Sequence, residues 1–97
     1  MKVVWTTDAY RDRTKIFSDI YKDNPAAAER MDNLFLAAAA RLKTFPKMGR
    51  PSELPGSREL IPHPSYRLVY EIKGDEIVMH SLMHTARQWP PVEDGQD

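Results

Sequence analysis

The chain has 97 residues, of which 41% are hydrophobic and 29% charged, a composition typical of a small globular protein with one modest core. Its 14 basic and 14 acidic side chains give a formal net charge of zero, which argues against a protein whose affinity depends on broad neutralisation of phosphates. The absence of cysteine excludes disulfide bonds, thiolate metal sites and a cysteine nucleophile, and no apolar run is long enough for a membrane span or a signal peptide. We expect a cytoplasmic protein without membrane association, with one domain over residues 1–90 and a flexible tail over residues 91–97.

The N-terminal part of the chain predicts one strand and one helix. Residues 2–6 are rich in β-branched and aromatic side chains, which favour a β-strand. Thr7 or Asp8 can cap the helix that follows, because a short polar side chain accepts a hydrogen bond from a backbone N–H of the first turn. Apolar side chains then recur at helical spacing as far as Tyr21, so this helix is expected to be amphipathic.

A second helix is predicted from Pro25 to about Phe45. Asn24 is a good N-cap, and proline at the first helical position loses no hydrogen bond that it would otherwise make. Apolar residues keep a helical period along this segment, which includes a run of alanines with high helix propensity. Because only two or three residues join the two helices, we expect an antiparallel helical hairpin.

The remaining elements predict a small antiparallel sheet. Residues 46–57 contain three prolines and two glycines and should form a loop, whereas residues 58–61 should form a short strand at a sheet edge. Two longer strands are predicted at residues 66–73 and 76–84, joined by a tight turn at Gly74-Asp75. The expected fold is therefore α+β: an N-terminal strand and an antiparallel helical hairpin packed on a sheet of about four antiparallel strands.

The two-residue turn also predicts which side chains face each other across the hairpin, because opposed residues of an antiparallel pair point to the same side. The side expected to cover the helices holds Ile72, Ile77, Tyr70, Met79, Leu68, Ser81, Tyr66 and Met83. The opposite side is expected to hold Glu71, Val78, Val69, His80, Arg67, Leu82, Ser65 and His84. In this register Arg67 and His84 are diagonal neighbours, roughly 6–8 Å apart at Cβ.

An arginine and two histidines on one open face suggest a chemical role, although a solvated sheet face is the simpler interpretation. Arg67 could hold a phosphate or a carboxylate through its two-pronged guanidinium, and His84 could transfer a proton near neutral pH. Together they could act on a phosphodiester. Because His80 and His84 would lie about 13 Å apart along a strand, we predict that they do not form a metal site. We also expect no cofactor.

Several short motifs occur in order along the chain. They are Val3-Val4-Trp5-Thr6, Asn24-Pro25-x-Ala27-Ala28, Leu42-x-x-x-Pro46-x-x-Gly49-Arg50, Arg58-Glu59-Leu60, Tyr66-Arg67-Leu68-Val69-Tyr70 and His84-x-x-Arg87-x-Trp89. Together, over about residues 2–90, they resemble the RelE/ParE toxins of bacterial type II toxin–antitoxin systems. The resemblance rests on the order and spacing of the motifs, since no single one is specific. It implies an antiparallel sheet with an N-terminal helical hairpin, in agreement with the predicted elements.

The resemblance also implies a partner and a target. Toxins of this kind are encoded beside an antitoxin, which wraps the toxin with a helix and often adds a strand. RelE-like members cleave mRNA in the ribosomal A site without a metal, and for such a nuclease the resemblance implies Arg67 and His84 as catalytic residues. ParE-like members inhibit DNA gyrase. The neutral charge and the motifs that begin at Asn24 and His84 favour the ParE-like group, so gyrase is the expected target and mRNA on the ribosome the alternative. A third possibility is a degenerate toxin that only binds its antitoxin.

Candidates for target binding are Arg50, Arg58, His80, Arg87 and Trp89. The turn around Arg50 either presents its guanidinium to a ligand or only redirects the chain. Trp89 is either a recognition residue or a packing anchor for the tail. The sequence leaves these alternatives open, together with the identity of the antitoxin and the oligomeric state.

Overall fold

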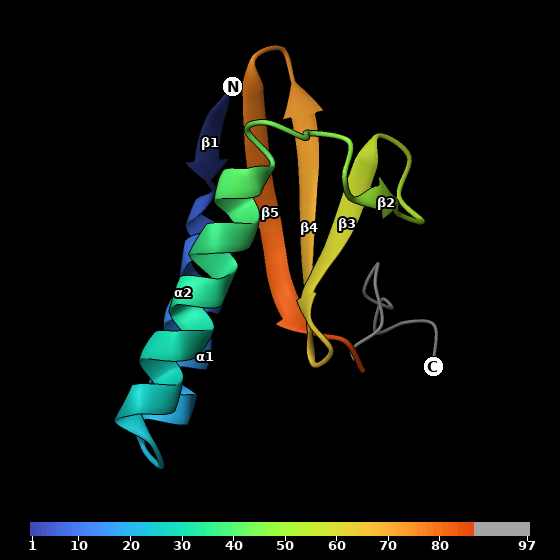
Figure 1. The fold of residues 1–97 in the computed structure, drawn as a ribbon. Coiled ribbons are helices and arrows are strands. Elements are labelled where there is room, and N and C mark those ends of the chain that lie inside the picture. Colours follow the sequence, from blue (N-terminus) through green and yellow to red (C-terminus); the bar gives the residue numbers. More distant parts are fainter. Residues whose placement is uncertain (87–97) are drawn as a thin grey trace, which may run out of the picture.

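A helical hairpin lies against one face of a β-sheet in the computed structural model, which describes residues 1–86 (Figure 1). The elements are β1 (Lys2–Trp5), α1 (Thr7–Tyr21), α2 (Pro25–Arg41), β2 (Arg50–Pro51), β3 (Ser57–His63), β4 (Tyr66–Lys73) and β5 (Glu76–His84). The strand order in the sheet is β1-β5-β4-β3-β2. The predicted α+β architecture is confirmed. The sheet has five strands rather than about four, because the short strand β2 forms inside the predicted loop.

Strands β1 and β3 also depart from the predicted sheet. β1 pairs with β5 in parallel rather than antiparallel orientation. A parallel pair requires a long connection, and here the whole helical hairpin and three strands lie between the two partners. β3 continues beyond the predicted end to His63, but its pairing with β4 is irregular between Leu60 and His63, where Pro62 has no N–H to donate.

Both helices begin at polar caps. The side chain of Thr6, one residue before the predicted cap, accepts a hydrogen bond of 3.1 Å from the backbone N–H of Ala9, and Asn24 accepts one of the same length from Ala27. α2 ends at Arg41 rather than near Phe45, because the next residues form tighter turns and the proline at position 46 disfavours helical backbone before it. Neither helix combines the length and the hydropathy needed to span a lipid bilayer.

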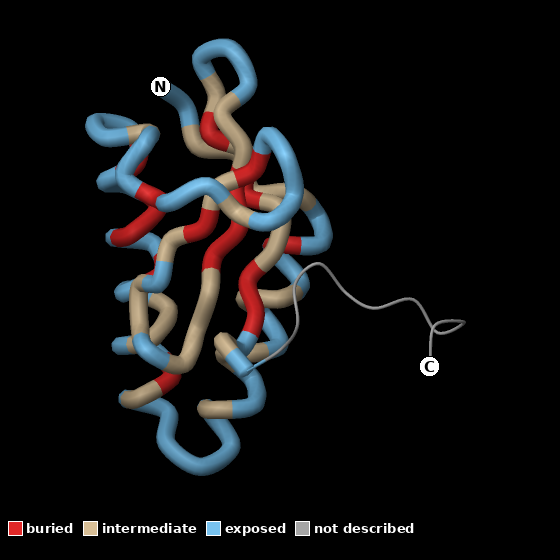
Figure 2. The backbone as a smooth tube through the Cα atoms, turned by 90° about the vertical axis from the view of Figure 1, so that its right-hand side faces the viewer, coloured by how far each residue is buried: buried red, intermediate tan, exposed pale blue. Residues whose placement is uncertain are grey.

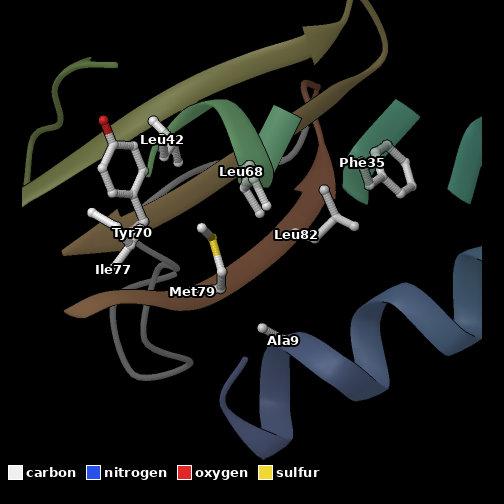
Figure 3. Packing of buried hydrophobic residues seen from close by; sticks show 9 residues of the cluster. Ala9, Phe35, Leu42, Leu68, Tyr70, Ile77, Met79 and Leu82 are labelled. Atoms are coloured by element: carbon white, nitrogen blue, oxygen red, sulfur yellow. The ribbon is translucent and has the colours of Figure 1, made fainter. Parts of the chain in front are cut away.

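The hydrophobic core lies between the helices and strands β4 and β5. Its buried members are Ala9, Phe35, Ala39, Leu42, Leu68, Tyr70, Ile77, Met79 and Leu82. Figure 3 shows these side chains packed between the strands and the helices. Along the backbone, buried positions are concentrated inside the molecule and exposed positions at the turns (Figure 2). The helices cover one face of the sheet, which we call the covered face, and the other face is the open face.

The β4–β5 hairpin follows the predicted register only for the four pairs closest to its turn, up to Tyr70 opposite Met79. The next pair is Val69 opposite Ser81, because His80 is an additional residue that forms a β-bulge. Every pair beyond the bulge is shifted by one residue from the prediction. The face assignments beyond the bulge were therefore wrong for Ser81, Leu82, Met83 and His84.

The bulge lies where the edge partner of β5 changes from a strand to a helix. β1 pairs with β5 as far as Met79, whose carbonyl oxygen accepts hydrogen bonds from both the backbone and the hydroxyl of Thr6. Beyond this point α1 runs along the edge, and the carboxylate of Asp12 accepts a hydrogen bond of 3.0 Å from the backbone N–H of Leu82. The shifted register places the Leu82 side chain, rather than that of Ser81, in the core.

Candidate functional site

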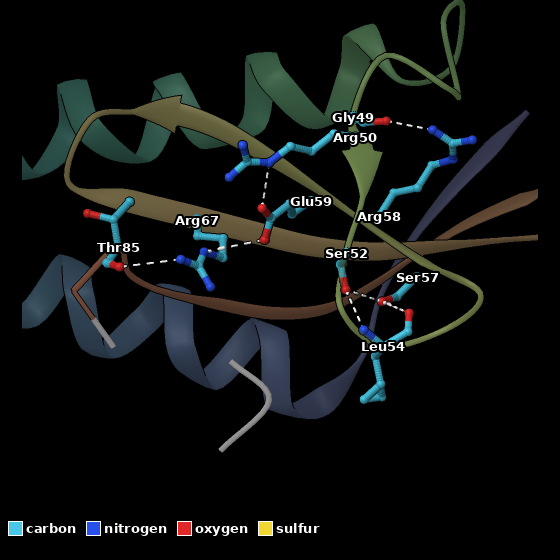
Figure 4. A network of polar contacts seen from close by, with 9 residues as sticks. All are labelled: Gly49, Arg50, Ser52, Leu54, Ser57, Arg58, Glu59, Arg67 and Thr85. Atoms are coloured by element: carbon cyan, nitrogen blue, oxygen red, sulfur yellow. Dashed lines mark hydrogen bonds and ion pairs between the residues drawn. The ribbon is translucent and has the colours of Figure 1, made fainter. Parts of the chain in front are cut away.

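The open face carries a cluster of three charged side chains, which we call the Arg–Glu–Arg cluster: Arg50 from β2, Glu59 from β3 and Arg67 from β4 (Figure 4). Nε of Arg50 donates a hydrogen bond of 2.6 Å to Oε1 of Glu59. Nε of Arg67 lies 3.4 Å from Oε2 of the same carboxylate, but without the alignment of a hydrogen bond. The side chain of Glu59 is only 10% exposed, so its charge is compensated by two arginines rather than by water.

Arg67 is held by the protein on both sides of its guanidinium. One terminal nitrogen, Nη2, donates a long hydrogen bond of 3.4 Å to the carbonyl oxygen of Thr85, while Nε lies beside Glu59. Its side chain is 19% exposed. Arg67 is on the open face as predicted, but its positive charge faces a carboxylate of the same chain.

His84 is not beside Arg67, contrary to the sequence-based prediction. The bulge places His84 opposite Tyr66, so its ring lies on the helix-facing side of the hairpin, with ring centroids 5.3 Å apart. Tyr66 in turn contacts Phe35 of α2 edge-on at 5.3 Å. Arg67 instead pairs with Met83 and points to the other face. The imidazole and the guanidinium proposed for nuclease chemistry are thus separated by the sheet.

His80 is on the open face, where its imidazole lies beside the carboxylate of Glu71. Its Nε2 lies 2.8 Å from Oε1 of Glu71, in a geometry that does not form a hydrogen bond, and both side chains are about one-third exposed. The two residues line a cleft of about 580 Å³ that extends between the N-terminal half of α1 and the β2–β3 loop, with Asp8, Asp12 and Leu54 on its walls. Three carboxylates, those of Asp8, Asp12 and Glu71, line this cleft with one arginine, Arg11, so the lining carries more negative than positive charge.

Tyr70 holds the loop before β2 through two hydrogen bonds of its hydroxyl group. The Tyr70 hydroxyl accepts a hydrogen bond of 3.0 Å from the backbone N–H of Gly49 and donates one of 2.7 Å to the carbonyl oxygen of Pro46. Burial raises the pKa of this hydroxyl above its ordinary value of 10.0, although the Gly49 hydrogen bond and the charge of Arg58 act in the opposite direction. The hydroxyl therefore remains protonated and able to donate at neutral pH.

Gly49 has no space for a larger side chain. A Cβ atom there would lie 2.7 Å from the carbonyl oxygen of Glu59 and from the ring of Tyr70. Arg58, one of the predicted target-binding residues, uses Nη1 to donate hydrogen bonds to the carbonyl oxygens of Gly49 at 2.7 Å and Lys47 at 3.4 Å. Arg58 thus holds the loop. Arg50, the residue after Gly49, has a side chain that is 66% exposed.

The predicted site residues therefore separate into distinct groups. Arg50 and Arg67 meet at Glu59, whereas His80, His84 and Arg58 each have other surroundings. Arg87 and Trp89 lie outside the described residues. Within residues 1–86, no three acidic and histidine side chains are arranged to hold a metal ion.

Sequence reasoning missed Glu59, the centre of the cluster. The alternation of side chains along a strand could have placed Glu59 on one face. Its contact with Arg67, however, depends on the pairing of β3 with β4, in which Glu59 lies opposite Val69. The turn between these strands gave no register from which that pairing could be derived.

Comparison with known proteins identifies related toxins along nearly the whole chain. Y4kP of Sinorhizobium fredii, which its name describes as a candidate toxin, is 34% identical over 92 residues, covering 94% of this chain and 95% of that protein. Toxin RelE2 of Caulobacter vibrioides is 34% identical over 86 residues, covering 89% and 97% respectively. A structure described as the chromosomal ParDE toxin–antitoxin system from P. aeruginosa superposes with a TM-score of 0.77 at 25% identity, covering 87% of this chain and 95% of that one.

A family-level match extends over the same region. Residues 3–89 match the family described as the ParE toxin of the type II toxin–antitoxin system parDE. This confirms the resemblance to RelE/ParE toxins that the sequence motifs indicated, and it implies a cognate antitoxin as partner. The chain therefore belongs to the ParE toxin family of type II toxin–antitoxin systems.

Proposed function

We propose that this toxin inhibits growth by binding DNA gyrase, without nuclease activity, and that a co-encoded antitoxin neutralises it. One observation carries the proposal on the target: Arg67 and His84 lie on opposite faces of the β4–β5 hairpin. Membership of the ParE family supports the same target, because the resemblance to ParE-like toxins implies inhibition of gyrase.

The geometry bears on the chemistry that a nuclease would require. Cleavage of RNA without a metal needs a cation to stabilise the charge that develops on the phosphate, and a group within hydrogen-bond reach to transfer a proton. In this chain the carboxylate of Glu59 lies 3.4 Å from Nε of Arg67, and would repel a phosphate there. The strand register places His84 opposite Tyr66, on the face away from Arg67, so the two side chains do not point to a common phosphate.

The second candidate is a ribosome-dependent mRNA endoribonuclease. The relative named RelE2, at 34% identity, supports this alternative. It would require a catalytic arrangement different from the Arg67–His84 pair, because that pair is not assembled among residues 1–86.

Two assays with the purified toxin distinguish the candidates. One measures supercoiling of relaxed plasmid by purified gyrase, and the other measures cleavage of mRNA on translating ribosomes. We expect that the toxin inhibits supercoiling in a dose-dependent way and leaves mRNA intact. Addition of the antitoxin should restore both gyrase activity and growth. Codon-positioned cleavage of mRNA together with unimpaired gyrase would instead establish the nuclease.

The toxin has a surface suitable for antitoxin binding on the helix side of the molecule. A shallow groove between β1 and α2 is lined by Val3, Trp5, Leu36, Ala39, Ala40 and Lys43. β1 is also the edge strand of the sheet, so its outer backbone groups are available for pairing. A helix in the groove or a strand added to β1 would each use a common mode of peptide recognition.

A further inference from the structure

Arg50 offers an unused part of its guanidinium at the surface. Its side chain is 66% exposed, and among residues 1–86 the only polar contact of the guanidinium is the 2.6 Å hydrogen bond from Nε to Glu59. An arginine side chain has five N–H donors, and four of them are on the two terminal nitrogens. The end of the guanidinium opposite the side-chain stem therefore remains available for a two-pronged contact with an oxyanion.

The position of Arg50 is fixed before any ligand binds. Its backbone pairs with Glu59 across β2 and β3, and the N–H of the preceding Gly49 is held by Tyr70. The carbonyl oxygen of Gly49 is held by Arg58 (Figure 4). The side chain is then oriented by Glu59, which is itself only 10% exposed. A long side chain that is already ordered loses less conformational entropy on binding.

The surroundings favour a protein carboxylate over a nucleic acid. The cluster contains a glutamate beside its two arginines, and the cleft on the same face is lined by three further carboxylates, those of Asp8, Asp12 and Glu71. Such a face repels a polyanion but can accept a single carboxylate at Arg50.

We propose that Arg50 binds a carboxylate side chain of the protein target, and that Glu59 is a positioning residue that orients the Arg50 guanidinium for this contact. The inference rests on the proposed function, which makes DNA gyrase the target. It goes further by naming the side of the toxin that meets gyrase and the chemical group that is recognised.

The test measures binding of purified toxin to purified gyrase in the absence of DNA. Arg50→Ala should weaken binding by about 30-fold, as expected for loss of an arginine that carries much of the binding energy of an interface. Arg50→Lys should weaken it by about 10-fold, because an ammonium group keeps the charge but lacks the planar fork. The matched control is Arg30→Ala, which removes an exposed arginine of α2 and should change affinity by less than about twofold. Thermal melting checks that each variant is folded.

The role of Glu59 is tested by a double-mutant cycle. Glu59→Gln keeps the size of the side chain but removes its charge, and should weaken gyrase binding by about fivefold in the wild-type background. In the Arg50→Ala background the same change should have no further effect on binding, because no guanidinium remains to be oriented. Equal effects in both backgrounds would overturn the positioning role, since a merely structural contribution of Glu59 does not depend on Arg50.

The outcomes separate this inference from the proposed function. If the wild-type toxin inhibits gyrase and Arg50→Ala binds it equally well, the inference is overturned while the proposed function stands. If Arg50→Ala weakens binding only when DNA is present, Arg50 contacts a phosphate and the carboxylate assignment is overturned. If the wild-type toxin neither binds nor inhibits gyrase, the proposed function fails and this inference fails with it.

Discussion

The two faces of the sheet use their side chains in different ways. On the face that α1 and α2 cover, large apolar residues such as Leu68, Tyr70 and Leu82 are at most 2% exposed. On the open face, Glu59 lies between two arginines and His80 lies against Glu71. The comparison indicates that the covered face holds the main hydrophobic core, and that the open face carries charges held in fixed positions. Substitutions in the apolar core should therefore act mainly on stability, and substitutions in the Arg–Glu–Arg cluster mainly on binding.

The largest effect on stability is expected from Phe35→Ala on the covered face. Phe35 is 1% exposed and packs edge-on against Tyr66, so its removal leaves a cavity in the core. The free energy of unfolding should fall by about 3–5 kcal/mol, measured by urea denaturation. A loss below about 1 kcal/mol would mean that the core closes around the missing ring, and that the covered face is less closely packed than the structure indicates.

A second substitution on the helix side should affect antitoxin binding alone. Leu36→Asp puts a charge into the groove between β1 and α2, and should weaken antitoxin binding by about 100-fold. Leu34→Asp is a matched control, because Leu34 is also on α2 and equally exposed at 39% but does not line the groove. Binding is measured by titration of co-purified partners. Equal losses for the two variants would show that the groove is not the antitoxin site.

The hydroxyl of Tyr70 connects the covered face with the loop before β2, and its removal should have an intermediate effect. Tyr70→Phe leaves the buried N–H of Gly49 without an acceptor, and should lower the free energy of unfolding by about 1–3 kcal/mol at neutral pH. Tyr10→Phe, at a residue that is 57% exposed, should change stability very little and serves as the control. If both variants match the wild type, the hydroxyl does not anchor the loop before β2.

The same hydroxyl predicts a pH dependence with a defined sign. Its pKa is raised in the folded state above the ordinary value of 10.0, mainly by burial. The corresponding stability is fully present below pH 10 and is lost as the pH rises through the folded-state pKa. The stability difference between wild type and Tyr70→Phe should therefore be constant near neutral pH and narrow above pH 10. A difference that widens at high pH would contradict the assignment.

Much of the fold could be predicted because its signals are local. Asn24 with Pro25 indicated the start of α2, and Gly74 with Asp75 indicated the hairpin and its first four pairs. The bulge at His80 could not be predicted, because it lies where β1 gives way to α1 beside β5, and those partners are about 70 residues apart in the sequence. One additional residue was enough to move His84 to the other face.

The candidate site was predictable only in part, for a related reason. Arg50 and Arg67 were both identified from their types and positions, but their convergence on Glu59 depends on pairing between three strands. Pairing of β2 with β3 was not predicted, since β2 lies in a segment rich in proline and glycine. The proposed recognition role of Arg50 therefore follows from tertiary contacts that the sequence did not indicate.

The central claim, inhibition of gyrase without nuclease chemistry, is tested most directly by His84→Gln in the supercoiling assay. The side chain of His84 is exposed and lies beside Tyr66 rather than beside Arg67, so the variant should inhibit purified gyrase with a loss of about 0–2 kcal/mol in binding relative to wild type. Growth inhibition by the variant should persist accordingly. A nuclease that used His84 for proton transfer would instead lose activity by about 100-fold or more. Loss of growth inhibition in His84→Gln, together with mRNA cleavage by the wild type and unaffected gyrase, would contradict the claim.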